Sequence, residues 1–198
     1  MRILTFIDSH GSVTALKKIK QKAKHADIIV CGGDFTIFEQ DIKHILLEFN
    51  KLKKDFLIIH GNHESENIVR HLCNIHKNLF YLHNKHFIKD DVLFIGWGGG
   101  GFSFKDKEFE IESKKFKKLI KKHKDKAVVL VVHAPPYKTK LDRIDHGHYG
   151  NKSFRDFIKE NKIDLVLCGH FHENNNKKDK IKVSTIINPG PYGRLINL

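Results

Sequence analysis

Several residue types that define common protein classes are scarce in this sequence. Its 198 residues include three cysteines, an odd number without a CxxC pair, which argues against a disulfide framework and a structural zinc site. No apolar run approaches the roughly 20 residues that span a bilayer, and the first residues are strand-like rather than typical of a signal peptide. We therefore expect a cytoplasmic protein without a membrane partner.

Arginine is also scarce, although the chain is strongly basic. Lysine and arginine total 36 against 23 acidic residues, giving a net charge of +13, yet arginine occurs at only five positions. Proteins that read nucleic acids usually depend on the planar, two-pronged arginine side chain. A diffuse lysine excess is more typical of solvated surface, although it attracts anionic substrates. Nucleic-acid binding is therefore possible but not indicated.

Five apolar runs each end in a residue that binds metal or moves protons. Such runs, bounded by glycine or polar residues, are typical of strands buried on both faces. The carboxyl ends of these strands form the crevice where open α/β sheets bind ligands. Two aspartates, one asparagine and several histidines would share this rim, which predicts a two-metal site. The runs are 2–10, 27–34, 56–64, 127–133 and 163–172.

The order of elements predicts an α/β protein formed by a single domain, residues 1–198. The first third alternates strands at 2–7, 27–31 and 55–60 with helices at 12–24, 39–52 and 65–73, the first helix capped by Ser12. Shorter strands at 78–88 and 91–97 would form a hairpin. The last part predicts helices at 112–123 and 151–161, an irregular stretch at 133–150, and strands at 127–132, 163–168 and 181–187. A polar run at 174–180 links to the last of these strands, and we expect 192–198 to pair with it.

Glycine immediately precedes a polar residue at three strand ends, before Asp34, Asn62 and His170. Hydrophobic packing does not require this arrangement. A single histidine or aspartate at a strand end is usually structural, but five such ends disfavour an entirely structural explanation. Oxygen and imidazole ligands without thiolate suit Mn, Fe, Zn, Ni or Co rather than Ca or Mg. Two such ions can hold a phosphoester and activate water, while a nearby imidazolium protonates the leaving alkoxide.

Five ordered blocks resemble the calcineurin-like metallophosphoesterase superfamily over essentially the whole chain. They are Asp8-x-His10, Gly33-Asp34, Gly61-Asn62-His63-Glu64, His133 and Gly169-His170-x-His172. Further segments are similar to small phosphoesterases related to the Icc cyclic-nucleotide phosphodiesterase. These segments are 96–100, 133–137, 147–153 and 188–191.

The resemblance implies a fold, a metal centre and a proton donor. The implied fold has two mixed β-sheets packed face to face and flanked by helices. One divalent transition-metal ion would be held by Asp8, His10, Asp34 and His172, and a second by Asp34, Asn62, His133 and His170. His63 would protonate the leaving group or, with Asn62, contact the substrate, and Glu64 would orient His63. Arg143 and His148, in a glycine-rich loop, are further candidates for substrate contact.

The leading hypothesis is a dinuclear metal-dependent phosphoesterase in which metal-activated water attacks a small phosphoester. The Icc-like segments favour a phosphodiesterase acting on a cyclic nucleotide or another small diester. A phosphomonoesterase or nuclease of the same superfamily is the alternative. Two hypotheses from other classes are a non-catalytic nucleic-acid-binding protein that uses the lysine-rich surface and a metal-containing interaction module.

Overall fold

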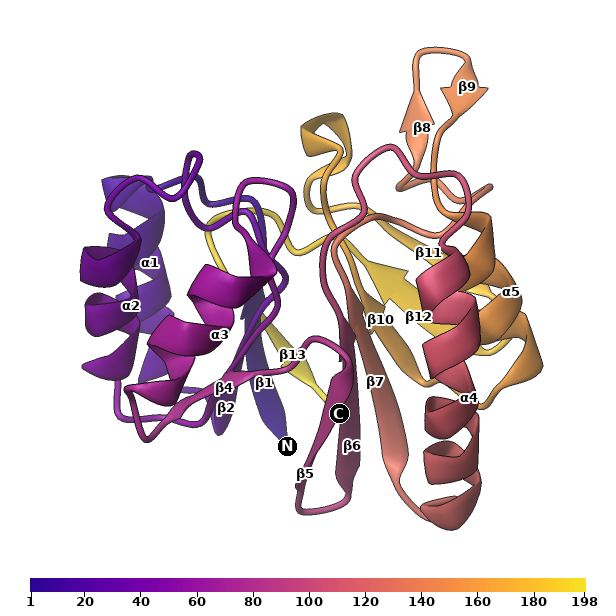
Figure 1. Ribbon diagram of the computed structural model, residues 1–198, viewed down its shortest axis with the longest axis horizontal. Helices are drawn as coiled ribbons and strands as arrows, with labels where there is room; N and C mark the ends of the chain where they lie inside the picture. The colour runs from indigo at the N-terminus through magenta and orange to yellow at the C-terminus, as the bar shows by residue number, and fades with distance from the viewer.

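The computed structural model describes residues 1–198 and contains two mixed β-sheets that pack face to face (Figure 1). In spatial order, the first sheet contains β13 (Arg194–Asn197), β1 (Arg2–Phe6), β2 (Ile28–Cys31), β3 (Phe56–Ile58) and β4 (Leu79–Tyr81). The second contains β11 (Lys178–Ile181), β12 (Ser184–Ile187), β10 (Leu165–Leu167), β7 (Ala127–Val132), β6 (Val92–Trp97) and β5 (Lys85–Lys89). The strands within each group β1–β4 and β12-β10-β7-β6 are parallel.

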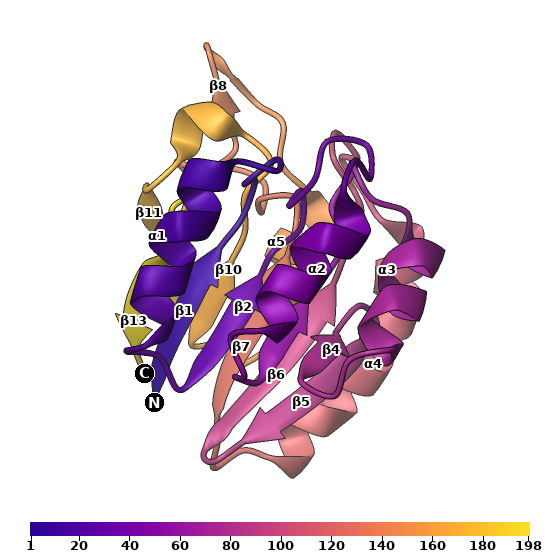
Figure 2. The same ribbon diagram turned by 90° about the vertical axis from the view of Figure 1, so that its left-hand side faces the viewer.

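Helices cover the outer face of each sheet (Figures 1 and 2). The first sheet carries α1 (Val13–Ala23), α2 (Ile42–Asn50) and α3 (Glu66–Asn74), and the second carries α4 (Lys107–Lys122) and α5 (Lys152–Glu160). Side-chain caps fix several helix starts: the Ser12 hydroxyl, the Asp106 carboxylate and the Asn151 amide oxygen each accept from a backbone N–H three residues later. The predicted α/β sandwich and the predicted Ser12 cap are confirmed.

Alternation along the strands divides the core into three apolar layers. In β1, Ile3 faces the other sheet, whereas Leu4 and Phe6 pack under the helices. In β7, Val129 and Val131 likewise join the layer between the sheets, while Leu130 packs toward α4 and α5. Strands buried on both faces therefore read as continuous apolar runs, which is why the five runs could be recognised from sequence.

Three predicted pairings or boundaries are wrong. Residues 192–198 do not pair with 181–187, because β12 already lies between β10 and β11; instead β13 pairs antiparallel with β1. The expected strand at 78–88 is divided, with β4 in the first sheet and β5 in the second, where β5 forms the predicted hairpin with β6. The strand expected at 181–187 is also divided: it becomes a β11–β12 hairpin whose turn includes Lys182 with a positive φ of 52°.

Two helix starts and one loop also differ from expectation. Helix α4 begins at Lys107 rather than 112, because Asp106 supplies a cap. Helix α2 begins at Ile42 rather than 39, because Phe38, Glu39 and Asp41 have positive φ angles that a right-handed helix cannot contain. The stretch expected to be irregular contains a short hairpin of β8 (Arg143–Ile144) and β9 (Gly147–His148), which projects from the body of the molecule (Figure 1).

No helix is long and apolar enough to cross a bilayer.

Candidate metal centre

The seven predicted metal ligands lie in the loops that follow the carboxyl ends of five parallel strands. Asp8 and His10 follow β1, Asp34 follows β2, and Asn62 follows β3. His133 directly follows β7. His170 lies after β10, and His172 lies in the short 3₁₀ helix η1 (His172–Asn174). These loops occupy the upper rim of the sandwich in Figure 1, so the topology gathers residues up to 164 positions apart.

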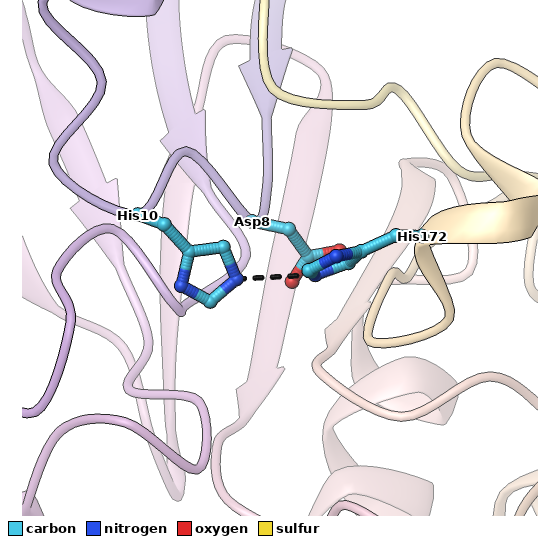
Figure 3. Close-up of side chains that lie close together, drawn as sticks. All are labelled: Asp8, His10 and His172. Atoms are coloured by element: carbon cyan, nitrogen blue, oxygen red, sulfur yellow. Dashed lines mark hydrogen bonds between the residues drawn. The ribbon is translucent and has the colours of Figure 1, made fainter.

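The side chains form three overlapping groups in which the possible ligand atoms lie within 4.8 Å of one another. Asp8, His10 and His172 form one group, and Figure 3 shows their side chains converging. The other groups are His10, Asp34 and His63, and Asp34, His133 and His170. Asp34 and His10 each belong to two groups, so the cluster is continuous.

Asp34 lies at the centre of this cluster. Its Oδ2 is 3.3 Å from His133 Nε2, 3.9 Å from His63 Nε2 and 4.0 Å from His10 Nε2. Its Oδ1 accepts a 2.9 Å hydrogen bond from the His63 backbone N–H. Burial opposes ionisation of Asp34, but the bond to His133 and the surrounding imidazoles lower its pKa below the usual range. One carboxylate therefore faces three imidazoles and can bridge two cations.

Backbone carbonyls orient two of the imidazoles. His10 Nδ1 lies 3.1 Å from the Thr36 carbonyl oxygen, and His133 Nδ1 lies 3.0 Å from that of Gly32. Since a carbonyl only accepts, each Nδ1 carries the proton and each Nε2 is left to bind a cation.

The raised pKa of His133 shows that the cluster stabilises a positive charge next to Asp34. Burial disfavours a charged His133, yet Asp34 and Asp8 raise its pKa to about 9. Its Nε2 lies 3.0 Å from Asn62 Oδ1 as well as close to Asp34, so a proton there is shared between two oxygens. A metal ion would replace this proton as the positive charge between the imidazole and the oxygens.

Unsatisfied polar atoms support the assignment to metal binding. Asp8 Oδ1 and His170 Nε2 are buried without a hydrogen-bond partner, an arrangement that native proteins rarely keep without a reason. Burial raises the pKa of Asp8 to about 6 and lowers that of His170 to about 4. His10 Nε2 and His172 Nε2 face each other at 3.1 Å, a separation that a shared cation would stabilise. The oxygen and imidazole donors present fit divalent transition ions.

The backbone is strained at the same positions. Asp8, His10, Asp34 and His170 have positive φ angles of 56°, 42°, 49° and 69°. Residues other than glycine rarely adopt this conformation, and such strain concentrates at functional sites. At two of the predicted glycines a side chain would clash with a carboxylate. A Cβ at Gly61 would lie 2.1 Å from Asp34 Oδ1, and one at Gly169 would lie 2.6 Å from Asp8 Oδ2. Glycine at these positions therefore leaves room for the two carboxylates.

Glu64 does not orient His63, and that expectation is wrong. Its buried carboxylate accepts hydrogen bonds from the backbone N–H groups of Asp34, Gly61 and Thr36, and from the Thr36 hydroxyl. His63 Nδ1 is buried without a partner. Glu64 therefore fixes the loop that carries Asp34. The sequence does not reveal the role of Thr36 in the site. Its carbonyl orients His10 and its hydroxyl bonds Glu64, and both positions depend on the conformation of this loop.

Arg143 and His148 lie in the projecting β8–β9 hairpin, and neither belongs to the three ligand groups. His148 Nδ1 bonds to the buried Asp142 carboxylate at 2.7 Å. Arg143 lines a separate cavity of about 730 Å³ together with Lys140, Glu173 and Lys177. Their contact with substrate stays a prediction.

The mixed sheets pack face to face and carry a cluster of carboxylates and imidazoles at the strand ends, an arrangement suited to binding divalent cations. The family model described as calcineurin-like phosphoesterase matches residues 1–174, and the chain belongs to this family. It is accordingly a metal-dependent phosphoester hydrolase. An uncharacterized protein of Methanocaldococcus jannaschii is 32% identical over 203 residues, covering 96% of this chain and 88% of that protein.

Solved structures share the fold at low sequence identity. The protein TT1561 of Thermus thermophilus has a TM-score of 0.74 at 18% identity, covering 96% of this chain and 88% of that chain. A dimetal phosphatase from Danio rerio has a TM-score of 0.64 at 11% identity, covering 94% and 86% of the two chains. These similarities extend across nearly the whole of both sheets.

Proposed function

We propose that the protein is a dinuclear phosphodiesterase that hydrolyses a small diester. The central observation is the position of Asp34, whose Oδ2 lies within 4.0 Å of the Nε2 atoms of His10, His63 and His133. A carboxylate shared by two ligand groups can bridge a pair of cations. A site for a single ion does not need such a shared ligand.

Each cation would have its own set of ligands on either side of Asp34. Asp8, His10 and His172 would hold one ion, and Asn62, His133 and His170 the other, with Asp34 bridging. Bound Mn, Fe, Zn, Ni or Co would supply Lewis acidity to phosphoryl oxygens and lower the pKa of water. The residues around these ligands keep them in place: the carbonyls of Thr36 and Gly32 orient two imidazoles, and Glu64 holds the Asp34 loop.

His63 is the proposed proton donor. Its Nε2 lies 3.9 Å from Asp34 Oδ2, and its side chain is 21% exposed, so the imidazole adjoins the metal centre and is still open to a substrate. A proton on Nε2 can pass to the leaving oxygen as the ester bond breaks, which avoids release of an unstabilised alkoxide. Asn62, the preceding residue, would contact the substrate as well as the ion held by His133 and His170.

The preference for diesters is supported by the likeness of four segments to Icc-related phosphoesterases. A phosphomonoesterase is the second candidate, supported by the fold shared with the Danio rerio dimetal phosphatase. For a nucleic-acid-binding role, the exposed lysines of α4 give little support, because the aromatic residues of this helix, Phe109 and Phe116, are buried and cannot stack on bases. A cytoplasmic location is supported by three buried cysteines with free thiols.

Metal analysis combined with a substrate panel tests the proposal. Protein stripped with chelator is reconstituted separately with Mn, Fe, Zn, Ni or Co, and bound metal is measured by elemental analysis. We expect two ions per chain and faster turnover of a chromogenic phosphodiester than of the matching monoester. Faster monoester turnover would reverse the substrate preference. Full activity in the stripped protein, unchanged by added metal, would refute the metal-dependent mechanism.

A further inference from the structure

Phe38 is an exposed aromatic residue held in an unfavourable backbone conformation beside the metal centre. The residue is 76% exposed and its φ is +45°. Bulky residues rarely adopt positive φ, and an exposed phenylalanine contributes little to a core. Its ring nevertheless stacks on His63, with centroids 4.4 Å apart and planes inclined by 29°. Neither burial nor backbone preference explains phenylalanine at this position.

Phe102 occupies a comparable position beside His170, a different histidine of the cluster. The residue is 71% exposed, and its ring meets that of His170 edge-on, with the centroids 4.8 Å apart. The preceding Gly99, Gly100 and Gly101 all have positive φ angles, a conformation that allows the chain to turn sharply beside the cluster. An added Cβ at Gly101 would lie 3.6 Å from His170. Phe102 is therefore brought to the rim by a glycine-rich loop that passes beside His170.

The two rings flank the metal centre from separate ligand groups. His63, under Phe38, belongs to the group with His10 and Asp34, whereas His170, beside Phe102, belongs to the group with Asp34 and His133. Asp34 is common to both groups. A phosphoryl group positioned over Asp34 would thus have an exposed aromatic ring toward each end of the cluster.

We propose that Phe38, with Phe102 as a second wall, forms a binding site for a flat aromatic group, an aryl ring or a nucleobase, carried by the substrate. The inference rests on the proposed phosphoesterase function and specifies its substrate class. Aromatic rings stack on exposed aromatic side chains without needing a particular hydrogen-bond pattern. Because Phe38 covers the proposed proton donor, the aromatic group it binds is the one on the leaving-group side.

A competing explanation is that Phe38 only positions His63. In that case, loss of the ring would impair catalysis on every substrate and would not change the relative affinity for aromatic ligands. Binding ligands that differ only by a ring separates the two explanations. Phenylphosphonate and methylphosphonate have the same anionic head group, and neither has an ester bond to hydrolyse.

The experiment measures the dissociation constants of both phosphonates by calorimetry on metal-reconstituted protein. In Phe38→Asn the ring is removed while a residue that tolerates positive φ keeps the loop in place. In Phe38→Tyr the ring is kept. Ile75→Ala, which truncates a 62% exposed apolar side chain at the end of α3, is the matched control.

We expect wild-type protein to bind phenylphosphonate about five- to tenfold more tightly than methylphosphonate, the lower end of the range for one stacking contact. In Phe38→Asn the ratio should fall toward one while methylphosphonate affinity changes less than about twofold. Phe38→Tyr and Ile75→Ala should keep the wild-type ratio, and Phe102→Ala should lower it partly. A wild-type ratio near one, or a Phe38→Asn protein that keeps the preference or loses both affinities equally, would overturn the inference.

The outcomes also separate this inference from the proposed function. Hydrolysis of phosphoesters together with equal affinity for the two phosphonates would refute the aromatic site and leave the phosphoesterase intact. Absence of both ester hydrolysis and phosphonate binding in metal-loaded protein would refute both proposals.

Discussion

Two clusters of histidines lie at the rim of the sandwich, and they differ in how their polar atoms are satisfied. The metal-centre cluster, formed by the three ligand groups around Asp34, contains unpartnered buried atoms and four residues with positive φ. The His60–His83 cluster consists of His60, Tyr81 and His83. In it the Tyr81 hydroxyl bonds His60 Nδ1 at 2.6 Å, and the Gly98 N–H donates to His83 Nδ1 at 2.8 Å. None of its three residues has a positive φ.

The comparison shows that burial of histidines does not itself indicate function. Burial lowers the pKa of His60 to about 3, in the same direction as it shifts His170. The perturbed pKa therefore does not distinguish the clusters. What distinguishes them is that one has unused ligand atoms around a strained backbone, whereas the other is completed by its own hydrogen bonds. The first is arranged to bind cations, and the second to support the loop at Gly98.

The largest effect is expected from Asp34→Asn. Replacing the shared carboxylate by an amide removes the negative charge that brings two cations together, so activity should fall by at least about 10³-fold and both ions should be lost. Elemental analysis and turnover of a chromogenic ester measure the two effects. Asp91→Asn, whose side chain is 98% exposed, is the matched control and should behave as wild type. Two retained ions with full activity would remove Asp34 from the centre.

His63→Gln should separate proton donation from metal binding. We expect metal content to stay unchanged while turnover falls by about 10²-fold or more, the usual contribution of a general acid. The loss should be greater for an alkyl ester than for a p-nitrophenyl ester, because a good leaving group needs less protonation. Equal losses for the two esters, or loss of one metal ion, would assign His63 a different role.

Glu64→Gln should weaken metal binding through the loop that carries Asp34. The amide cannot accept all of the hydrogen bonds that the Glu64 carboxylate receives. Changes in groups that support metal ligands typically reduce affinity about 10- to 100-fold. Competition with a metal-binding dye measures this affinity, and Glu108→Gln on the exposed surface of α4 is the control. Unchanged metal affinity in Glu64→Gln would show that Asp34 keeps its position without Glu64.

His83→Gln should change the pH dependence of stability and leave the metals bound. Burial lowers the pKa of His83, so the unfolded chain binds a proton more readily than the folded chain. The stability contributed by neutral His83 is present above pH 6.5 and is lost as pH falls below that value, by at most about 1.4 kcal/mol per pH unit. Urea unfolding between pH 7.5 and 5 should show a shallower decline in the variant. An identical slope would show that the pKa of His83 is the same in the folded and unfolded chains.

The sequence located the residues of the cluster better than the strand pairings. Local signals placed three of them, because an apolar run, a glycine and a polar residue together mark a strand end at Asp34, Asn62 and His170. The pairing of β13 with β1 joins residues nearly 200 positions apart, and no local pattern specifies it. The position of Phe38 was equally unpredictable, because its positive φ depends on the loop that Glu64 holds.

His60 and His63 show the same limit within one strand end. Both follow the apolar run of β3, and nothing in their spacing distinguishes the histidine held by Tyr81 from the one that lies beside Asp34. Tyr81, which binds His60, comes from the next strand, so the difference arises only when β3 and β4 pair.

The left-handed conformations of Asp8, His10, Asp34 and His170 have a consequence for the lifetime of the protein. Strained geometry persists only where its surroundings hold it, and cations that bind the folded chain alone add to its stability by mass action. At a hundredfold excess over the dissociation constant, this gain is about 2.7 kcal/mol per ion. Cellular ion supply should therefore govern how rapidly proteases degrade the protein, in addition to its turnover of substrate.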